Sequence, residues 1–318
     1  MRQSELPVKD STISATVLQR VRAATVMPVL TRVSRVESPA DGFIKYLFSG
    51  EGPGLFEAVS IPLLNRPEDP KHIVCVSSQV GCAMGCAFCA TGRMGFTRNL
   101  AAWEMVEQVA HIRRDSPHPV RGVVFMGMGE PFMNYEAVIR AARILSEPCG
   151  LAIAAKAITI STVGIVPAIQ RFTSEGHAYR LVVSLTTADP ARRRQLLPVE
   201  ATHGAGELMD ALRAYHAATR RRVILAWTMI AGVNTRPEDA RQLGALLAGL
   251  PAKLDLIDVN DPSSRFQPPS DAERNAFLDA LRIHVGIPVA RRYSGGADIQ
   301  AACGTLTAMR LNSPPVPG

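Results

Sequence analysis

Three cysteines in one short segment, Cys82, Cys86 and Cys89, constrain this chain more than any other feature of its sequence. Their Cys-x3-Cys-x2-Cys spacing places three thiols on one loop, and soft sulfur ligands suit iron–sulfur clusters. A cubane cluster that only transfers electrons normally has four cysteine ligands. Because this loop supplies three, one iron is left open for a small molecule, and the sequence predicts a [4Fe-4S] cluster with a chemical role.

S-adenosylmethionine (SAM) can bind such an open iron through its amino and carboxylate groups. That arrangement is typical of radical-SAM chemistry, in which one electron cleaves the sulfonium and releases a 5'-deoxyadenosyl radical. The alternative is a zinc knuckle with Cys75 as the fourth ligand. Structural zinc sites usually combine two Cys-x2-Cys units at a distance, so the spacing favours the cluster with SAM.

The composition is that of a folded protein with an excess of positive charge. Hydrophobic residues make up 47% of the 318 residues and charged residues 20%, which allows a substantial core and excludes a disordered chain. The net charge is +7, and most basic residues are arginines. Arginine binds phosphate through paired hydrogen bonds, which favours a nucleic acid partner. A GC-rich genome with many arginine codons would produce the same excess.

The sequence also suggests a cellular compartment. The first residues lack the apolar core of a signal peptide, and no apolar run reaches the roughly 18 residues that a membrane span needs. Six cysteines, of which three are clustered, fit a metal site in a reducing compartment better than a disulfide framework. We therefore expect a cytoplasmic protein that neither spans a membrane nor is secreted.

Two regions follow from the hydrophobic pattern. Residues 1–70 are expected to form a small β-rich N-terminal module, with a short helix at about 13–23 and strands near 27–36, 43–48 and 55–61. In residues 71–310, apolar strand segments alternate with helical segments, which predicts parallel βα units of the α/β class. The predicted strands are 73–77, 120–126, 156–160, 181–186, 222–230 and 254–259. The predicted helices are 101–114, 134–146, 165–175, 206–219, 236–249 and 270–284. Residues 311–318 are expected to be a disordered tail.

Polar residues and glycines follow every predicted strand. Catalytic groups of βα barrels lie beyond the C-terminal ends of the strands, so these positions predict one shared site. The first strand is followed by the cysteine loop, and the others by the following residues: Gly127–Pro131, Ser161–Gly164, Ser184–Thr187, Asn234 and Asn260. Glu130 is a candidate partner for the amino group of SAM, although its segment also suits a simple tight turn.

Five segments together resemble the RlmN/Cfr family of radical-SAM enzymes. They are residues 75–82 (CVSSQVGC), 89–92 (CATG), 95–100 (GFTRNL), 127–131 (GMGEP) and 298–304 (DIQAACG). Enzymes of this family methylate an adenine of 23S ribosomal RNA at carbon-2 or carbon-8, and RlmN also modifies tRNA. The likeness spans about residues 35–310 and implies a partial (β/α)6 radical-SAM barrel, with which the six predicted strands agree.

The resemblance implies catalytic roles for Cys303, Cys75 and Glu57. One SAM methylates the Cys303 thiolate, and a radical from a second SAM removes a hydrogen from that S-methyl group. The resulting methylene radical adds to adenine, which leaves RNA covalently attached to Cys303. Cys75 then attacks the Cys303 sulfur, so that a disulfide forms and methylated RNA is released. Glu57 aligns with the proton acceptor of the family. The alternative for Cys303 is an ordinary loop cysteine, and the alternative for Glu57 is a solvated glutamate.

The resemblance also implies the cofactor ligands and partners. Cys82, Cys86 and Cys89 are the expected cluster ligands, whereas Cys149 matches no motif. The electron donor is expected to be a flavodoxin or ferredoxin, and the enzyme a monomer. The expected SAM contacts are Gly129, Glu130, Ser161, Ser184, Leu185, Thr186 and Asn260.

The chain departs from the family pattern at several positions. The family usually has histidine at position 186, Glu-Tyr at 226–227, a Trp-Asn-Pro-Phe-like stretch near 259–262 and an arginine before the C-terminal glycine–acid motif. Here these positions hold Thr186, Ala226-Trp227, Val259-Asn260-Asp261-Pro262 and Gly295-Gly296. The roughly 35 residues before the region of likeness are also too few for the helical accessory domain typical of RlmN.

These departures leave two alternatives to a 23S rRNA methyltransferase. The first is the same chemistry on another RNA or on a small aromatic metabolite. The second is a non-catalytic RNA-binding module with structural zinc. The arginine runs 192–194 and 220–222 favour RNA, unless they are solvated surfaces of helices or loops.

Overall fold

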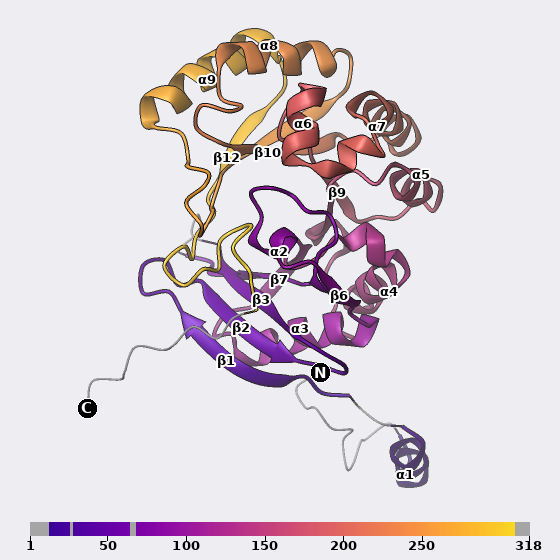
Figure 1. Cartoon of the computed structure of the whole chain (residues 1–318). Helices are drawn as coiled ribbons and strands as arrows, with labels where there is room; N and C mark the ends of the chain where they lie inside the picture. The colour runs from indigo at the N-terminus through magenta and orange to yellow at the C-terminus, as the bar shows by residue number, and fades with distance from the viewer. Residues whose placement is uncertain (1–12, 26–27, 64–67, 309–318) are drawn as a thin grey trace, which may run out of the picture.

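The computed structural model describes residues 13–25, 28–63 and 68–308. Its main feature is a ten-stranded sheet in the order β1-β2-β3-β4-β7-β8-β9-β10-β11-β12 (Figure 1). The strands are β1 (Thr31–Glu37), β2 (Ile44–Ser49), β3 (Leu55–Pro62), β4 (His72–Cys75), β7 (Val120–Phe125), β8 (Ile158–Thr162), β9 (Arg180–Ser184), β10 (Val223–Met229), β11 (Ala252–Asp258) and β12 (Val289–Arg292). A separate pair, β5 (Gln79–Gly81) and β6 (Phe96–Asn99), flanks the cysteine loop.

The strands from β4 to β12 in this sheet are all parallel, which is the partial barrel expected from the sequence. Six of them match the predicted strands. Residues 181–183 of β9 are buried, as a strand covered on both faces requires. The seventh, β12, was not predicted, because its four residues include two exposed arginines and give no apolar run.

Helices cover the outside of the parallel strands (Figure 1). The six long ones confirm the predicted helices and are α3 (Ala102–Asp115), α4 (Tyr135–Ser146), α5 (Val166–Ser174), α7 (Ala205–Thr219), α8 (Pro237–Leu246) and α9 (Asp271–His284). Two short helices, α2 (Ala90–Arg93) and α6 (Pro190–Leu196), lie at strand exits. Side-chain caps define some of the helix starts: Ser270 accepts from the backbone of Glu273 in α9, and Asp189 accepts from the backbone of Arg192 in α6.

The N-terminal module extends the same sheet. Strands β1, β2 and β3 pair antiparallel, and β3 pairs antiparallel with β4, so one hydrogen-bonded sheet continues into the barrel. The predicted first helix is observed as α1 (Ala15–Ala24), capped by Ser14. The predicted strand at 27–36 begins outside the described residues, and the predicted tail, 311–318, lies wholly outside them. In the described part of the chain, every helix is too short or too polar to span a membrane.

Candidate active site

The cysteine loop runs from the end of β5 to α2, beyond the C-terminal end of β4. Its path depends on Gly81, whose φ is +73° and where an added Cβ would lie 1.9 Å from the carbonyl oxygen of Gly95. The backbone N–H of Cys82 donates to that same oxygen at 2.8 Å. Cys82 is buried, whereas Cys86 and Cys89 are partly exposed. The turn thus fixes three cysteines on one short loop.

Two of the three thiols, those of Cys82 and Cys86, share a poorly solvated environment with Glu130. Burial raises the pKa of Cys82 to about 12 and that of Cys86 well above its ordinary value. The negative charges of Glu130 and of the neighbouring thiolates raise both further. Cysteine thiols must lose their protons to bind a metal, and the repulsion between neighbouring thiolates opposes that loss. The positive charge of the iron ions in a cluster would offset this repulsion. The donor set therefore fits the predicted cluster.

A small apolar cluster surrounds the cysteine loop. Met84, Cys86, Ala87 and Phe88 pack against a group of buried side chains beyond the strand ends. Those side chains are Val163, Leu196, Leu197, Val199, Ile230 and Val259. An apolar shell limits water at a metal centre and tunes its properties. This feature also suits an iron–sulfur cluster.

The described residues contain no group of three or more His, Cys, Asp or Glu side chains that is suited to a single metal ion. Cysteine ligands of a cubane each bind a different iron, so a cluster does not require their sulfurs to converge on one point. Cys75, the fourth ligand of the zinc alternative, lines a cavity with Cys303 and Cys89. The geometry thus gives the zinc knuckle no support.

Glu130 lies at the exit of β7, and its turn requires glycine. Gly129 has a φ of +99°, and an added Cβ there would lie 2.5 Å from Cβ of Gln79. The Glu130 carboxylate is buried and accepts hydrogen bonds from the backbone N–H groups of Phe132 (3.0 Å) and Val163 (2.9 Å). Burial raises the pKa of Glu130 to about 7, although these hydrogen bonds oppose the shift. A desolvated carboxylate of this kind is suited to bind an ammonium group.

We predict that Glu130→Gln weakens SAM binding to the reconstituted protein by about 10- to 100-fold, because a charge-assisted hydrogen bond to the amino group is lost. Equilibrium dialysis with labelled SAM measures the effect, and iron content shows whether the cluster is retained. Glu51→Gln, at an exposed glutamate in the β2–β3 turn, is the control. Unchanged SAM affinity in Glu130→Gln would leave Glu130 only a role in shaping the turn.

The next strand exits contribute the other predicted SAM contacts. Ser161 at the end of β8 and Ser184 at the end of β9 are partly exposed on adjacent parallel strands. Leu185 and Thr186 are fully buried. Thr186 adopts a left-handed φ of +61°, and its buried hydroxyl has no hydrogen-bond partner. A β-branched residue in this conformation is strained, so its surroundings must hold it in place.

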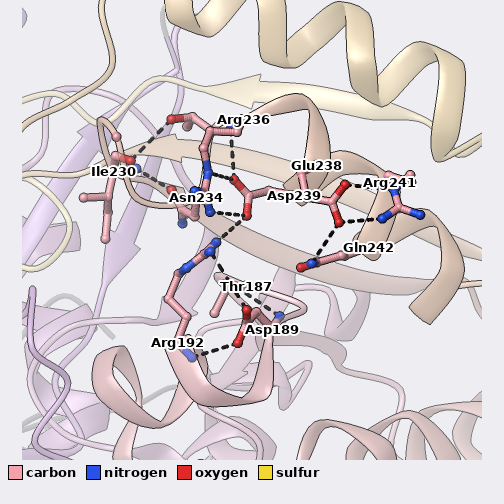
Figure 2. Close-up of polar contacts among 12 residues, drawn as sticks. Thr187, Asp189, Arg192, Ile230, Asn234, Arg236, Glu238, Asp239, Arg241 and Gln242 are labelled. Atoms are coloured by element: carbon pink, nitrogen blue, oxygen red, sulfur yellow. Dashed lines mark hydrogen bonds and ion pairs between the residues drawn. The ribbon is translucent and has the colours of Figure 1, made fainter.

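Asn234 holds the exits of β9 and β10 together. Its amide donates to the carbonyl oxygens of Thr186 and Thr228, each at 2.7 Å, and accepts from the backbone N–H of Ile230 at 2.8 Å. Figure 2 shows the adjoining ion pair, in which Arg192 of α6 reaches Asp239 of α8. The sequence indicated Asn234 only as a residue that follows a strand and did not predict these side-chain hydrogen bonds.

Two departures from the family pattern have structural explanations at this edge. Trp227 is a buried core residue that donates to the Asn234 carbonyl at 3.2 Å and packs on Phe277. Asp261, beyond β11, forms an ion pair with Arg93 of α2 at 2.7 Å. That pair ties the β11 exit to the helix after the cysteine loop.

The C-terminal segment brings Cys303 to the cysteine loop. The carbonyl oxygen of Gly304 accepts from the backbone N–H of Ala90 at 2.8 Å, and that of Leu306 accepts from the Thr91 hydroxyl at 2.7 Å. Cys303 and Cys75 line a cavity of about 110 Å³ together with Cys89. Segments that are far apart in sequence thus place both predicted catalytic cysteines beside the expected cluster.

The two cysteines differ in exposure. Cys75 is buried, which raises the pKa of its thiol far above the usual range. Cys303 is an exposed residue, but burial of its thiol raises the pKa above the ordinary value, although a hydrogen bond with Ser294 and the charge of Arg292 oppose the shift. All six cysteines are free in this structure, so the predicted disulfide between Cys303 and Cys75 is not formed.

Asn260 connects the expected SAM contacts to Cys303. Its amide donates to the Ser294 hydroxyl at 3.1 Å, and that hydroxyl accepts from the backbone N–H of Cys303 at 3.0 Å. Ser294 is therefore a site residue that was missed by the sequence analysis. Because β12 was not predicted, the sequence offered no strand end that could have indicated Ser294.

Glu57 lies in β3 of the N-terminal module and is fully buried. Its carboxylate pairs with Lys45 at 3.0 Å and accepts from the backbone N–H groups of Thr307 (2.9 Å) and Ala308 (3.0 Å). Lys45 also donates to the carbonyl of Gln300 at 3.3 Å. Glu57 is thus not the solvated glutamate of the alternative interpretation, because it is buried and anchors the segment that carries Cys303.

The arginine runs do not form a basic surface at this site. Arg193 is fully buried in an ion pair with Glu200, and Arg192 pairs with Asp239. Residues 220–222 are exposed but immediately precede β10, at the end of the sheet opposite the cysteine loop. Arg192 and Arg193 thus form contacts within the protein, whereas Arg194 and residues 220–222 are exposed, and their contact with RNA stays a prediction. Cys149, which matched no motif, is exposed in the loop between α4 and β8 at that same end.

Comparisons with known proteins agree with this arrangement. Residues 76–243 match the family model of the Radical SAM superfamily. A probable RNA methyltransferase of Anaeromyxobacter sp. (strain Fw109-5) is 53% identical over 92% of this chain and 85% of its own length. The dual-specificity RNA methyltransferase RlmN of Syntrophobacter fumaroxidans is 42% identical over 87% of this chain and 80% of its own length.

One solved structure matches nearly the whole chain. The crystal structure of a radical SAM methyltransferase from Sphaerobacter thermophilus superposes with a TM-score of 0.86 at 41% identity. The match covers 94% of this chain and 87% of that chain.

Proposed function

Because the chain belongs to the radical SAM superfamily and to its RlmN family of RNA methyltransferases, we propose that it methylates carbon-2 or carbon-8 of an adenine in 23S rRNA. The chain is a radical SAM RNA methyltransferase of the RlmN type, with a [4Fe-4S] cluster and SAM as cofactors. This membership removes the non-catalytic zinc module. The observation that carries the finer proposal is the cavity shared by Cys75 and Cys303 beside Cys89.

Of the residues that would hold the cofactors, Cys89 lines this cavity, and Asn260 donates to Ser294 of its lining. Cys82, Cys86 and Cys89 are the proposed cluster ligands. When bound, the cluster and SAM supply a methyl group for transfer and an electron that generates a hydrogen-abstracting radical. The proposed SAM contacts are Gly129, Glu130, Ser161, Ser184, Leu185, Thr186 and Asn260.

Cys303 is the proposed methyl carrier. Burial of its thiol raises the pKa, while the Ser294 hydrogen bond and the positive charge of Arg292 limit that rise and so help to stabilise the thiolate that a displacement reaction requires. An S-methylcysteine at this position would lie in the cavity with Cys89. An aromatic amidine carbon is electrophilic and does not accept a methyl cation directly, which is why a carrier is needed.

Cys75 is the proposed resolving cysteine. Cys75 is buried, which raises the pKa of its thiol far above the usual range, whereas Cys303 is an exposed residue and is better placed to receive the methyl group. After the substrate is bound to Cys303, Cys75 would lose its proton and attack the Cys303 sulfur. The S–S bond would form as the S–C bond breaks, and the leaving product carbon would take up a proton to become a methyl group. The disulfide of this step would be transient.

Likeness to the family supports the remaining assignments. We propose that the electron donor is a flavodoxin or ferredoxin and that the enzyme acts as a cytoplasmic monomer. We also propose Glu57 as the proton acceptor, in addition to its observed contacts with Thr307 and Ala308.

Methyl transfer to defined RNAs tests the proposed function. The reconstituted enzyme is incubated anaerobically with reductant, methyl-labelled SAM and an unmodified 23S rRNA transcript, and the digested RNA is mapped by mass spectrometry. The proposal predicts label on carbon-2 or carbon-8 of one adenine. Label in tRNA but not in 23S rRNA would support the alternative RNA substrate. Failure to label either RNA, when Cys303 has been methylated, would favour the small aromatic substrate.

Glu57 offers a second prediction, because its two roles affect different steps. We expect Glu57→Gln to slow methylation of Cys303 by SAM about 10- to 100-fold, since loss of the anchor displaces the segment that carries the thiol. A residue that acts only as a proton acceptor would leave this first step unchanged and impair only transfer to RNA. Mass spectrometry of the Cys303 peptide over time measures the first step, and exposed Glu51→Gln is the matched control.

A further inference from the structure

Tyr293 lies at the cavity that contains the two catalytic cysteines. It immediately follows β12 and lines the same cavity as Cys75 and Cys303. Its residue surface is 69% exposed, the highest fraction of any aromatic residue among the large exposed hydrophobic residues of the described chain. A large ring is thus open to solvent beside the proposed methyl carrier.

This exposed ring is held in one orientation. The Tyr293 hydroxyl donates to the Asp41 carboxylate at 2.8 Å, and the ring meets that of Phe43 edge to face, with centroids 6.1 Å apart. Asp41 also accepts from the backbone N–H of Gly296 at 2.8 Å. Phe43 is buried, so the partner ring is itself fixed. A ring that is already ordered loses little conformational freedom when a ligand packs on it.

Gly295 shows how closely the aromatic pair packs on the backbone. A Cβ added there would lie 2.4 Å from Oδ2 of Asp41, 2.5 Å from Cε2 of Phe43 and 2.6 Å from Cε1 of Tyr293. Position 295 therefore has no room for a side chain unless these groups move. It is one of two glycines that stand where the family commonly has an arginine, so the departure makes room for the aromatic pair.

We propose that Tyr293 is the stacking platform that receives the substrate adenine in front of Cys303, an inference that rests on the proposed function. Enzymes that modify a base within RNA must unstack it, and unstacked bases commonly bind on aromatic side chains. Tyr293 combines an open ring, a fixed orientation and a position on the cavity of the methyl carrier. Phe43 and Asp41 are its positioning residues.

Three variants separate stacking from other roles. Tyr293→Leu removes the aromatic ring, Tyr293→Trp retains one, and Ile283→Ala changes a 76% exposed apolar side chain near the C-terminal end of α9, away from the site. The reconstituted enzymes are assayed for methyl transfer to a 23S rRNA transcript. Methylation of Cys303 by SAM is measured separately, because it needs no RNA. Fluorescence of an RNA fragment with 2-aminopurine at the mapped adenine reports stacking directly.

We expect Tyr293→Leu to raise KM for RNA about 5- to 100-fold, as the loss of one base–aromatic stack requires, and to abolish quenching of 2-aminopurine. Cys303 methylation should stay at the wild-type rate, Tyr293→Trp should restore KM, and Ile283→Ala should match wild type. Wild-type KM and quenching in Tyr293→Leu would overturn the platform while leaving the proposed function intact. A wild-type enzyme that methylates Cys303 but no RNA would instead refute the proposed function, and the platform with it.

Discussion

Cys303→Ala is expected to abolish methyl transfer to RNA while SAM is still cleaved to 5'-deoxyadenosine. The two events depend on different parts of the site, because the loop of Cys82, Cys86 and Cys89 would hold the cluster whereas Cys303 would carry the carbon. Alanine removes the only sulfur that could bear the methyl group at this position. Labelled SAM reports methyl transfer, and chromatography of 5'-deoxyadenosine reports cleavage in the same reaction.

Cys149→Ala is the matched control for this prediction, since Cys149 is an exposed cysteine at the opposite end of the barrel. It should retain both activities. Methylated RNA from Cys303→Ala at a rate near that of wild type would show that another group carries the methyl. Loss of SAM cleavage together with transfer would point to damage of the site as a whole.

Cys75→Ala is expected to stall with substrate covalently attached to Cys303. Without the resolving thiol, the bond between the Cys303 sulfur and the product carbon is not broken, so turnover stops after one addition. Nuclease digestion followed by mass analysis of the Cys303 peptide should reveal an adenosine-bearing fragment. The mass of the attached fragment would also identify the substrate, because a different RNA or a small molecule would leave a different adduct.

The resolving role requires that the two sulfurs can approach bonding distance, which limits the Cα atoms of a disulfide to about 7 Å. The shared cavity supports this requirement, although 228 positions separate the two cysteines in the sequence. Full turnover by Cys75→Ala with no trapped adduct would show that release occurs without Cys75.

The sequence predicted the barrel well because each long parallel strand is an apolar run that ends in polar residues or glycines. It missed β12, whose short sequence lacks such a run. Glycine positions such as Gly129 were informative, since the turn around Glu130 has no room for a side chain there. The local sequence pattern was thus sufficient to predict the strands and the motifs that follow them.

Residue environments were harder to predict than residue positions. The run 192–194 reads as a basic surface, yet Arg193 is buried against Glu200 because α6 packs over the exit of β8. Glu57 accepts hydrogen bonds from Thr307 and Ala308, which lie 250 and 251 positions away in the sequence. Asp41 and Tyr293 are likewise 252 positions apart. A single sequence holds no local signal for such pairs.

The central claim is that the methyl group reaches RNA by way of Cys303, and an isotope chase tests it most directly. Reconstituted enzyme is first methylated at Cys303 with SAM that carries a trideuterated methyl group, and is then freed of that SAM. Unlabelled SAM, reductant and 23S rRNA are added for one turnover. Because the S-methyl group gives up one hydrogen atom before it joins the adenine, the account predicts a product methyl group that retains two deuterium atoms. A product methyl group without deuterium would contradict it, since the carbon would then have come directly from the second SAM.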